Sequence, residues 1–517
     1  MKLLSAPLVA GLLLLLCVVK SDAQVFPGAT DYYELGLLFS DYSYTGSARI
    51  AGLGGAQIGL GGDISSALSN PAGLGFYNRS ELSISPAYTT FTHQSTYFTP
   101  APAGFNTSQL QSQTTGTFGI DNLGVVFHKG KAETSAGPFR GGSFAISYSK
   151  VNKFNGDFGL GGANVTNDII DNFVQNANAG NFNVLTNQAY DVYAIDEFLD
   201  PNTNQTFFDR TVPEFPSEEF PVQQSDFITT SGNQSQLSFS YGANFSDRFY
   251  IGAGLGLMTL RYNQSKQYIE DYAPGGFMQR LQILEFQEQS GVGVNVTGGI
   301  IFRPIPVVTV GFSVISPTWY SMSEFATART EMRWDNFEYD PNTILTTETA
   351  SSESLFDYSM QTPTRLNFGT AFFFNKNGFI TADIELVNYR AIRLTGKGVS
   401  LENQNEIIDR LYSSAVNLRL GGEYRYDKFR FRVGYALVGD PYAVTEDFSR
   451  ARQGISGGLG FRARSFYTDL AVIYSFFNSR YSPYFLDPRE DPEIFISPWA
   501  DVSSHSINAV LSLGYFF

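Results

Sequence analysis

Cysteine is almost absent from this chain. Among 517 residues the only one is Cys17, which lies in the apolar run from Leu8 to Val19. This run follows a basic start at Lys2 and precedes a small-residue cleavage pattern, Ser21-Asp22-Ala23. The run is too short to span a bilayer, so residues 1–23 are expected to be a secretory signal peptide.

The surroundings of Cys17 bear on its fate. Leu16 stands directly before it, where lipid attachment requires a small residue, so loss of Cys17 with the signal peptide is favoured over lipidation. The mature chain is then expected to begin at Gln24 and to contain no cysteine. That excludes disulfides and any zinc site that needs a thiolate ligand.

Charged residues and long apolar runs are also scarce. Charged residues make up 16% of the chain, and no later stretch reaches 18 consecutive apolar residues, so no transmembrane helix is expected. The net charge of −15 argues against a nucleic-acid partner. Aromatic residues, in contrast, make up 15%, with 46 Phe and 29 Tyr. An exported, aromatic-rich chain without apolar helices is typical of a transmembrane antiparallel β-barrel.

Apolar residues alternate with polar ones over much of the chain after Ser80. Near the C-terminus Ile507, Ala509, Leu511 and Leu513 alternate with polar or small residues, which places one set on each face of a strand. A soluble sandwich alternates in the same way. Strand-like runs such as Phe249 to Tyr262 exceed the usual strand length, however, and suit a tilted bilayer crossing.

The spacing of these runs predicts fourteen crossings. They fall near residues 80–92, 118–128, 141–152, 234–246, 248–263, 283–303, 307–319, 357–375, 378–395, 411–426, 428–440, 453–464, 465–478 and 503–517. Short turns alternate with long polar segments, as in outer-membrane barrels with tight periplasmic turns and long outer loops. The long segments are 93–117, 153–233, 264–282, 320–356, 396–411, 440–453 and 479–502.

The longest polar segment, 153–233, is expected to contain one helix over Thr166 to Asn178. It also contains Asp200 to Asn204, which resembles the start of a calcium loop. Because the glycine and glutamate of such a loop are missing, a solvated acidic loop is the favoured interpretation.

The stretch from Ser47 to Phe76, SARIAGLGGAQIGLGGDISSALSNPAGLGF, is rich in glycine and almost uncharged. It has too much glycine for a stable helix and too few polar groups for an open loop. We therefore predict that residues 24–79 form a hatch, or plug, inside a barrel formed by residues 80–517. The candidate gating residues of this hatch are Asn70, Pro71, Ala72, Gly73 and Gly75.

This glycine-rich stretch resembles the hatch of the FadL-type family of outer-membrane transporters, in a Bacteroidetes-like variant. The strand pairs Thr362 to Tyr389 and Asn417 to Tyr442 are similar to those of that branch. The terminal Leu513-Gly514-Tyr515-Phe516-Phe517 resembles the signal read by the barrel-assembly machinery, in which Tyr515 and Phe517 would act.

The resemblance implies a fourteen-strand barrel in the outer membrane of a Gram-negative bacterium, surrounded by outer-membrane lipid and lipopolysaccharide. It implies passive uptake of hydrophobic small molecules, such as long-chain fatty acids. These would be captured outside, pass to a lumen pocket and leave sideways through the wall. A monomer is expected.

Charged residues on several strands are expected to face the lumen by alternation. A salt-bridge network that braces barrel and hatch is the favoured role, and contact with a substrate carboxylate is the alternative. The set is Asp383, Glu385, Arg419, Glu423, Arg425, Lys428, Arg430 and Arg432.

No enzyme motif is present in the sequence. The three histidines, His93, His128 and His505, are far apart, and neither a G-x-S-x-G elbow nor a phosphate-binding loop occurs. No enzyme activity, cofactor or metal is therefore expected. The alternatives to a hydrophobic-compound channel are a general porin, a structural or adhesive barrel, and uptake of a less apolar molecule.

Overall fold

The computed structural model describes residues 31–42, 46–101, 104–108, 111–131, 137–444, 448–489 and 495–517. The expected signal peptide, Cys17 and the first residues of the expected hatch lie outside these ranges. Among the described residues no helix has the length and apolar character needed to cross a membrane.

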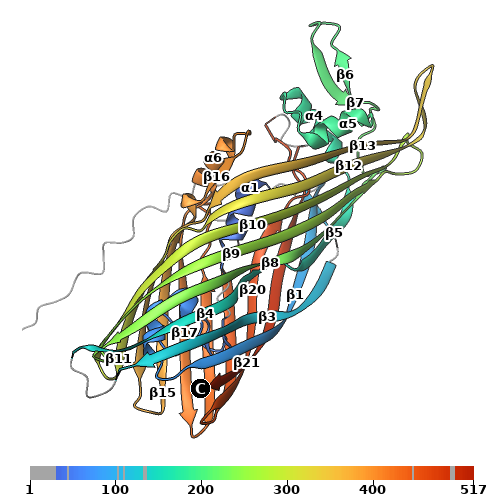
Figure 1. Ribbon diagram of the computed structural model, residues 1–517. Coiled ribbons are helices and arrows are strands. Elements are labelled where there is room, and N and C mark those ends of the chain that lie inside the picture. Colours follow the sequence, from blue (N-terminus) through green and yellow to red (C-terminus); the bar gives the residue numbers. More distant parts are fainter. Residues whose placement is uncertain are drawn as a thin grey trace, which may run out of the picture.

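Fourteen antiparallel strands form a closed barrel, as the sequence predicted (Figure 1). Each strand pairs with the next in the barrel, and the last pairs with the first, with Leu82 opposite Tyr515. The barrel strands are β1 (Glu81–Ala101), β3 (Gln111–Gly130), β4 (Phe139–Lys153), β8 (Val222–Phe245), β9 (Phe249–Asp271), β10 (Met278–Ile305), β11 (Val308–Ile315), β14 (Arg365–Phe373), β15 (Gly378–Asn388), β17 (Ser414–Tyr426), β18 (Phe429–Val438), β19 (Arg452–Arg462), β20 (Phe466–Tyr481) and β21 (Trp499–Phe516).

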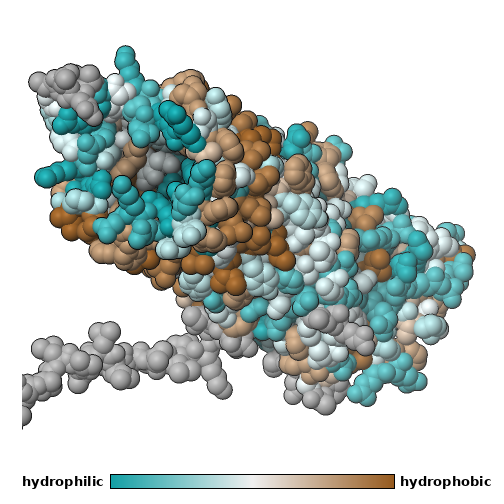
Figure 2. Space-filling view, turned by 90° about the horizontal axis from the view of Figure 1, so that it is seen from below, coloured by the Kyte–Doolittle hydropathy of each residue, from teal (hydrophilic) through white to brown (hydrophobic). Residues whose placement is uncertain are grey.

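The outward side chains form an apolar band around the barrel. Figure 2 shows this band on one face, with hydrophilic residues gathered on both sides of it. On β9, for example, Ile251, Leu255 and Leu257 are exposed while the alternate positions face inward. Four phenylalanines elsewhere on the barrel are likewise exposed, namely Phe372, Phe374, Phe429 and Phe431.

Several segments expected to be long loops are largely strands. The segment 320–356 forms most of a hairpin, β12 (Trp319–Asp340) and β13 (Thr343–Gln361), and the segment 93–117 contains the end of β1, the short β2 (Gly104–Thr107) and the start of β3. Figure 1 shows β12 and β13 running to the end of the barrel that carries α4 (Ile169–Asn178) and α5 (Val184–Asp191). The prediction missed these strands because a strand with water on both faces needs no apolar alternation.

The barrel wall is continued upward by β12 and β13. Strand β10 pairs with β11 over Thr297–Ile305 and with β12 over Met278–Val294. Short breaks at 316–318 and 362–364, each with a central proline, separate β11 from β12 and β13 from β14. Proline cannot donate a ladder hydrogen bond, which accounts for the breaks. The single crossing predicted at 357–375 is therefore the end of β13 followed by β14.

The remaining elements lie inside the barrel or at its extracellular end. Inside are α1 (Tyr32–Ser40), α2 (Ala48–Ala51), α3 (Ser66–Ser69) and the 3-10 helix η1 (Pro71–Phe76). At the extracellular end are β5 (Gly156–Asn164), α4 (Ile169–Asn178), α5 (Val184–Asp191), β6 (Ile195–Leu199), β7 (Thr206–Arg210), the 3-10 helix η2 (Tyr389–Ala391), β16 (Arg393–Gly396) and α6 (Glu402–Leu411).

The expected helix in the longest polar segment is confirmed as α4, and α5 and the β6–β7 hairpin lie beyond it. Asp200 is in the turn of that hairpin, where its carboxylate accepts hydrogen bonds from the Asn202 amide at 2.8 Å and the Thr203 hydroxyl at 2.7 Å. The local role of this carboxylate is thus to fix a turn. Among the described residues no cluster of acidic, histidine or cysteine side chains is arranged to hold a metal.

The C-terminal residue lies one position beyond its strand. Strand β21 ends at Phe516, and the Phe517 amide donates to the Ser80 carbonyl at 3.1 Å, at the point where β1 begins.

Deletion of Phe517 is expected to reduce the amount of heat-resistant folded barrel in the outer membrane, measured by gel mobility. Ligand binding per folded molecule should be unchanged. Full assembly of the truncated chain would contradict a role for this residue in assembly.

Candidate functional site

The N-terminal segment, defined here as residues 31–79 without 43–45, lies within the barrel. Its central feature is Asn70, which is buried and extended between α3 and η1. The Asn70 side-chain oxygen accepts from the Ala72 amide at 3.2 Å, and its nitrogen donates to the Ile58 carbonyl at 2.8 Å. The same nitrogen lies 3.4 Å from the Ile300 carbonyl on β10, so this side chain joins two parts of the segment to the wall.

Glycines allow the backbone of this segment to approach the wall closely. A Cβ at Gly75 would lie 2.8 Å from the Ala243 carbonyl oxygen of the wall, whereas one at Gly73 would lie 2.5 Å from the Ser66 hydroxyl within the segment itself. The wall contributes glycines as well, which the sequence analysis did not single out. At each of these wall positions a Cβ would collide with the segment: Gly242, Gly252, Gly299, Gly311, Gly369, Gly421 and Gly434. Their signal in the sequence is glycine at inward positions of otherwise regular strands.

Acidic residues of the wall also bind the segment. The carboxylate of Asp383 accepts from the backbone amides of Gln57 and Ile58, at 2.6 and 2.9 Å. On the segment, Arg49 lies 3.9 Å from both Asp63 and Glu423. Two of the charged residues expected in the lumen, Asp383 and Glu423, are thus buried against the segment.

Apart from Lys428, the other expected lumen charges divide into three groups. Glu385 binds Arg419 at 3.2 Å and also Arg365 at 3.0 Å. Glu423 binds Arg425 at 2.7 Å and Arg432 at 2.8 Å. Arg430 donates to backbone carbonyls of its own turn instead.

Lys428 departs from the expected lumen-facing set. It lies in the exposed two-residue turn between β17 and β18, where strand alternation does not apply.

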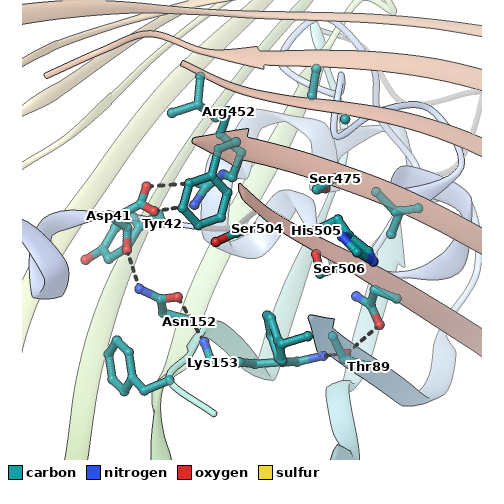
Figure 3. Close-up of a pocket in the computed structure, with 18 of the residues that line it drawn as sticks. Asp41, Tyr42, Thr89, Asn152, Lys153, Arg452, Ser475, Ser504, His505 and Ser506 are labelled. Atoms are coloured by element: carbon teal, nitrogen blue, oxygen red, sulfur yellow. Dashed lines mark hydrogen bonds and ion pairs between the residues drawn. The ribbon is translucent and has the colours of Figure 1, made fainter. Parts of the chain in front are cut away.

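Above the glycine-rich part of the segment the lumen contains a cavity of about 380 Å³. Tyr42 and Ala51 of the segment line one side of it, and Thr89, His93 and His505 line the opposite side. Figure 3 shows Asp41 between Arg452 on β19 and Asn152 near the end of β4. The Asp41–Arg452 ion pair measures 2.7 Å, and Asn152 donates to the Asp41 carbonyl at 3.1 Å. The end of α1 is thus attached to opposite sides of the lumen.

The wall beside this cavity is incompletely paired. Strands β3 and β4 pair only from Asn122 to Gly130 and from Gly141 to Ser149. Above Asn122, β3 pairs with β1, whereas the last residues of β4 pair with β8. The unpaired interval contains a second cavity of about 190 Å³, which shares Lys150, Lys153 and Asn155 with the lumen cavity. We call this interval the wall gap.

Side chains bound the wall gap above and below. Thr115 donates to Asp157 at 2.5 Å at its upper end, and Asn122 donates to Ser149 at 2.9 Å at its lower end. The register between β1 and β3 shifts at Ser85 and Pro86, which leaves Asp121 as the extra residue of a β-bulge. A proline within a strand was the sequence signal for this irregularity.

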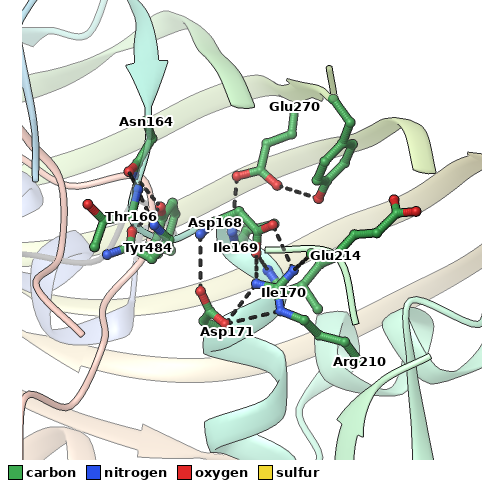
Figure 4. Close-up of polar contacts among 12 residues, drawn as sticks. Asn164, Thr166, Asp168, Ile169, Ile170, Asp171, Arg210, Glu214, Glu270 and Tyr484 are labelled. Carbon is green, nitrogen blue, oxygen red and sulfur yellow. Dashed lines mark hydrogen bonds and ion pairs between the residues drawn. The ribbon is translucent and has the colours of Figure 1, made fainter. Parts of the chain in front are cut away.

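The extracellular end carries a cap formed by α4 and α5. Figure 4 shows Arg210 between Asp168 and Asp171, and Glu270 of β9 at the start of α4. The Arg210–Asp171 ion pair measures 2.7 Å, and the Ile169 amide donates to Glu270 at 3.0 Å. A cavity of about 230 Å³ lies between Val184 of α5 and strands β9, β10, β12 and β13.

The chain is similar to a Pseudomonas aeruginosa FadL homologue, with 14% identity, a TM-score of 0.54, and coverage of 92% of this chain and 99% of that one. The Pseudomonas putida toluene transporter TodX covers the same shares at 12% identity and a TM-score of 0.49. The Ralstonia pickettii toluene transporter TbuX does so at 12% identity and a TM-score of 0.47.

No protein-family model matches the chain, and no curated protein matches it by sequence. The first structural comparison shows that the chain has the FadL-type barrel fold, as the sequence resemblance predicted. A closed barrel with an apolar outer band leaves no free sheet edge within hydrocarbon apart from the wall gap, and the chain is a β-barrel of the Gram-negative outer membrane.

The contact between Asn70 and the wall generates a prediction with a matched control. A Cβ at Gly299 would overlap the Asn70 side-chain oxygen, whereas one at the neighbouring Gly298 would meet open space. Gly299→Ala should therefore weaken the packing of the N-terminal segment against the barrel wall by about 1–3 kcal/mol, whereas Gly298→Ala should not. Asn70→Ala should have an effect of the same sign, because the Ile58 carbonyl loses a buried donor.

The measurement is hydrogen exchange at amides of residues 47–76, together with single-channel conductance in planar bilayers. We expect faster exchange and more frequent ion-conducting openings in Gly299→Ala and Asn70→Ala than in Gly298→Ala. Equal exchange in all three variants would show that this contact does not hold the segment.

The cap generates a second prediction. Burial raises the pKa of Asp171 to about 6, although Arg210 acts to lower it. Because this value exceeds the ordinary 3.8, the folded state binds the proton more tightly, and the stabilisation gained by protonation is lost as pH rises through about 6. Amides of α4 should be better protected at pH 5 than at pH 7 after correction for intrinsic exchange. Asp171→Asn should flatten this dependence, and an equal dependence in the variant would refute the assignment.

Proposed function

From the FadL-type barrel fold we propose that this protein is a passive channel for the uptake of hydrophobic compounds across the outer membrane. Residues 24–79 act as its hatch, and solutes leave sideways through the wall gap between β3 and β4. The observation that carries the proposal is that the lumen cavity and the cavity in the wall gap are neighbours, since both are lined by Lys150, Lys153 and Asn155.

Known proteins of this fold support the proposal. The similar Pseudomonas aeruginosa protein is a FadL homologue, and TodX and TbuX are toluene transporters. We propose that this protein also takes up hydrophobic compounds, and long-chain fatty acids are one candidate class.

The contacts of the N-terminal segment favour a lateral route over passage to the periplasm. Below the lumen cavity the segment packs backbone to backbone against wall glycines, and Asp383 and Glu423 bind it from the wall. A solute moving straight down would have to break these buried contacts, several of them with charged groups. A general porin requires an open lumen, so these contacts disfavour that alternative.

The physical driving force is apolar burial. Transfer from water to an apolar surface stabilises a solute by about 25 cal/mol per Å². The cavity beside α5 is the outermost binding site for such a solute, and the lumen cavity is the second. The apolar band is the last apolar surface that it meets (Figure 2). A series of moderate sites that ends in hydrocarbon needs no energy coupling.

A covalent bridge across the wall gap tests the route. The expected mature chain contains no cysteine, so introduced cysteines react without competition. Thr117→Cys and Asn155→Cys, joined by a short bifunctional linker, should block uptake of a hydrophobic fluorescent probe by whole cells. The matched control is Val125→Cys with Ile146→Cys, because these residues are already paired between β3 and β4. Uptake that survives the first bridge and equals the control would contradict exit at this place.

A further inference from the structure

The cavity in the wall gap is lined by basic and neutral residues, whereas the two acidic residues at the edges of the gap, Asp121 and Asp157, do not line it. Lys150 and Lys153 line this cavity of about 190 Å³, and none of its lining residues is acidic. Thr117 and Asn155 add neutral polar groups. A cavity of this composition is suited to an anionic group, because lysine ammonium groups form their strongest hydrogen bonds with carboxylates and phosphates.

The two lysines differ in their partners. Lys153 donates to Asp121 at 2.9 Å and to the Thr89 hydroxyl at 2.7 Å, so its charge is compensated. The Lys150 side chain forms no hydrogen bond or ion pair with any of the described residues. Its ammonium group reaches across the wall gap, and a Cβ at Gly119 would lie 2.7 Å from its Nζ. The absent side chain at Gly119 leaves room for this group.

The position of Lys150 relative to the membrane follows from strand register. Lys150 pairs with Ser235 on β8, and Ser235 pairs with Thr259 on β9. Two residues lower on these strands, Leu237 and Leu257 are exposed and apolar. Lys150 therefore lies at the extracellular edge of the apolar band, where the head groups of amphiphiles reside and where an ammonium group can meet water.

Lys150 lines both the lumen cavity and the cavity in the wall gap. A compound that occupies both would place its apolar chain among side chains such as Ile473 and Phe477 and its head group beside the free ammonium. We infer that the wall gap binds an anionic head group, a carboxylate or a phosphate, and that Lys150 makes the channel favour amphiphilic acids over neutral compounds of equal chain length.

This inference rests on the proposed function, since it names the class of compound that the same opening favours. The probes are palmitate and hexadecanol, which share a chain length and differ in the head group. Binding is measured by calorimetry on the full barrel in phosphatidylcholine nanodiscs. The variants are Lys150→Gln, which removes the charge, and Lys150→Arg, which keeps it. The control is Lys129→Gln, an exposed lysine on the same side of the barrel that does not line the cavity.

Wild type should bind palmitate more tightly than hexadecanol. Lys150→Gln should weaken palmitate binding about tenfold, the effect expected for one hydrogen bond to a charged group, and leave hexadecanol binding unchanged. Lys150→Arg and Lys129→Gln should resemble wild type. High salt should reduce the preference for palmitate, because the charge at the edge of the band is screened.

A second arm distinguishes the two sources of an anion. The same variants are placed in nanodiscs containing lipopolysaccharide, and retention of that lipid after delipidation is measured. If Lys150→Gln lowers lipid retention and leaves palmitate binding unchanged, the anion is a membrane phosphate, and the preference for acids is overturned. If neither quantity changes, the anion site itself is overturned. Wild type that binds neither probe contradicts the proposed function, whereas equal binding of both probes overturns this inference alone.

Discussion

Close backbone approach between the N-terminal segment and the barrel wall is the constraint on which the rest of this structure depends. Glycines on both sides make it possible, since a Cβ at Gly75 or at Gly242 would enter the opposing backbone. Buried polar groups then fix the segment at defined points. Asn70 bonds the Ile58 carbonyl, and Asp383 accepts two backbone amides. Together they place the backbone of this segment against one level of the barrel and leave a cavity above it.

The position of this packed layer explains why the incomplete pairing of β3 and β4 matters. If the lumen beside the wall gap were filled by side chains, no solute could reach the gap from inside. The gap instead lies next to the lumen cavity. The bulge at Pro86 and the extra residue Asp121 separate β3 from β4 locally. The Lys153–Asp121 ion pair crosses the separation without closing the cavity. A single local irregularity thus interrupts the wall directly beside the lumen cavity.

Much of the fold could be predicted from sequence because a barrel strand in lipid repeats one rule along its length. Outward residues such as Leu511 and Leu513 must be apolar, and their alternation predicted the strands and their number. Where both faces meet water, as in much of β12 and β13, that rule does not apply and the strands were taken for loops. Lys428 was misplaced for a related reason, since alternation holds within a strand and not in a turn.

The site was less predictable because it depends on which strands lie side by side. The glycine-rich stretch indicated close approach, but its partners, such as Gly299, are far away in sequence and look like ordinary strand glycines. The carboxylate of Asp383 was expected in the lumen, yet its bonds to the Gln57 and Ile58 amides require the three-dimensional fold. Lys150 carried no sequence signal, because its lack of a partner is visible only once the strands are arranged.

The central claim is that a hydrophobic solute travels from the lumen cavity into the wall gap. The most direct measurement is a structure of the full barrel in nanodiscs with a terminally brominated alkyl compound, in which the bromine positions are located by anomalous scattering or in cryo-EM maps. The account predicts bromine sites in the lumen cavity and between β3 and β4 near Lys150. Bromine found below Asn70, among the wall glycines on the periplasmic side, with none in the wall gap, would contradict it.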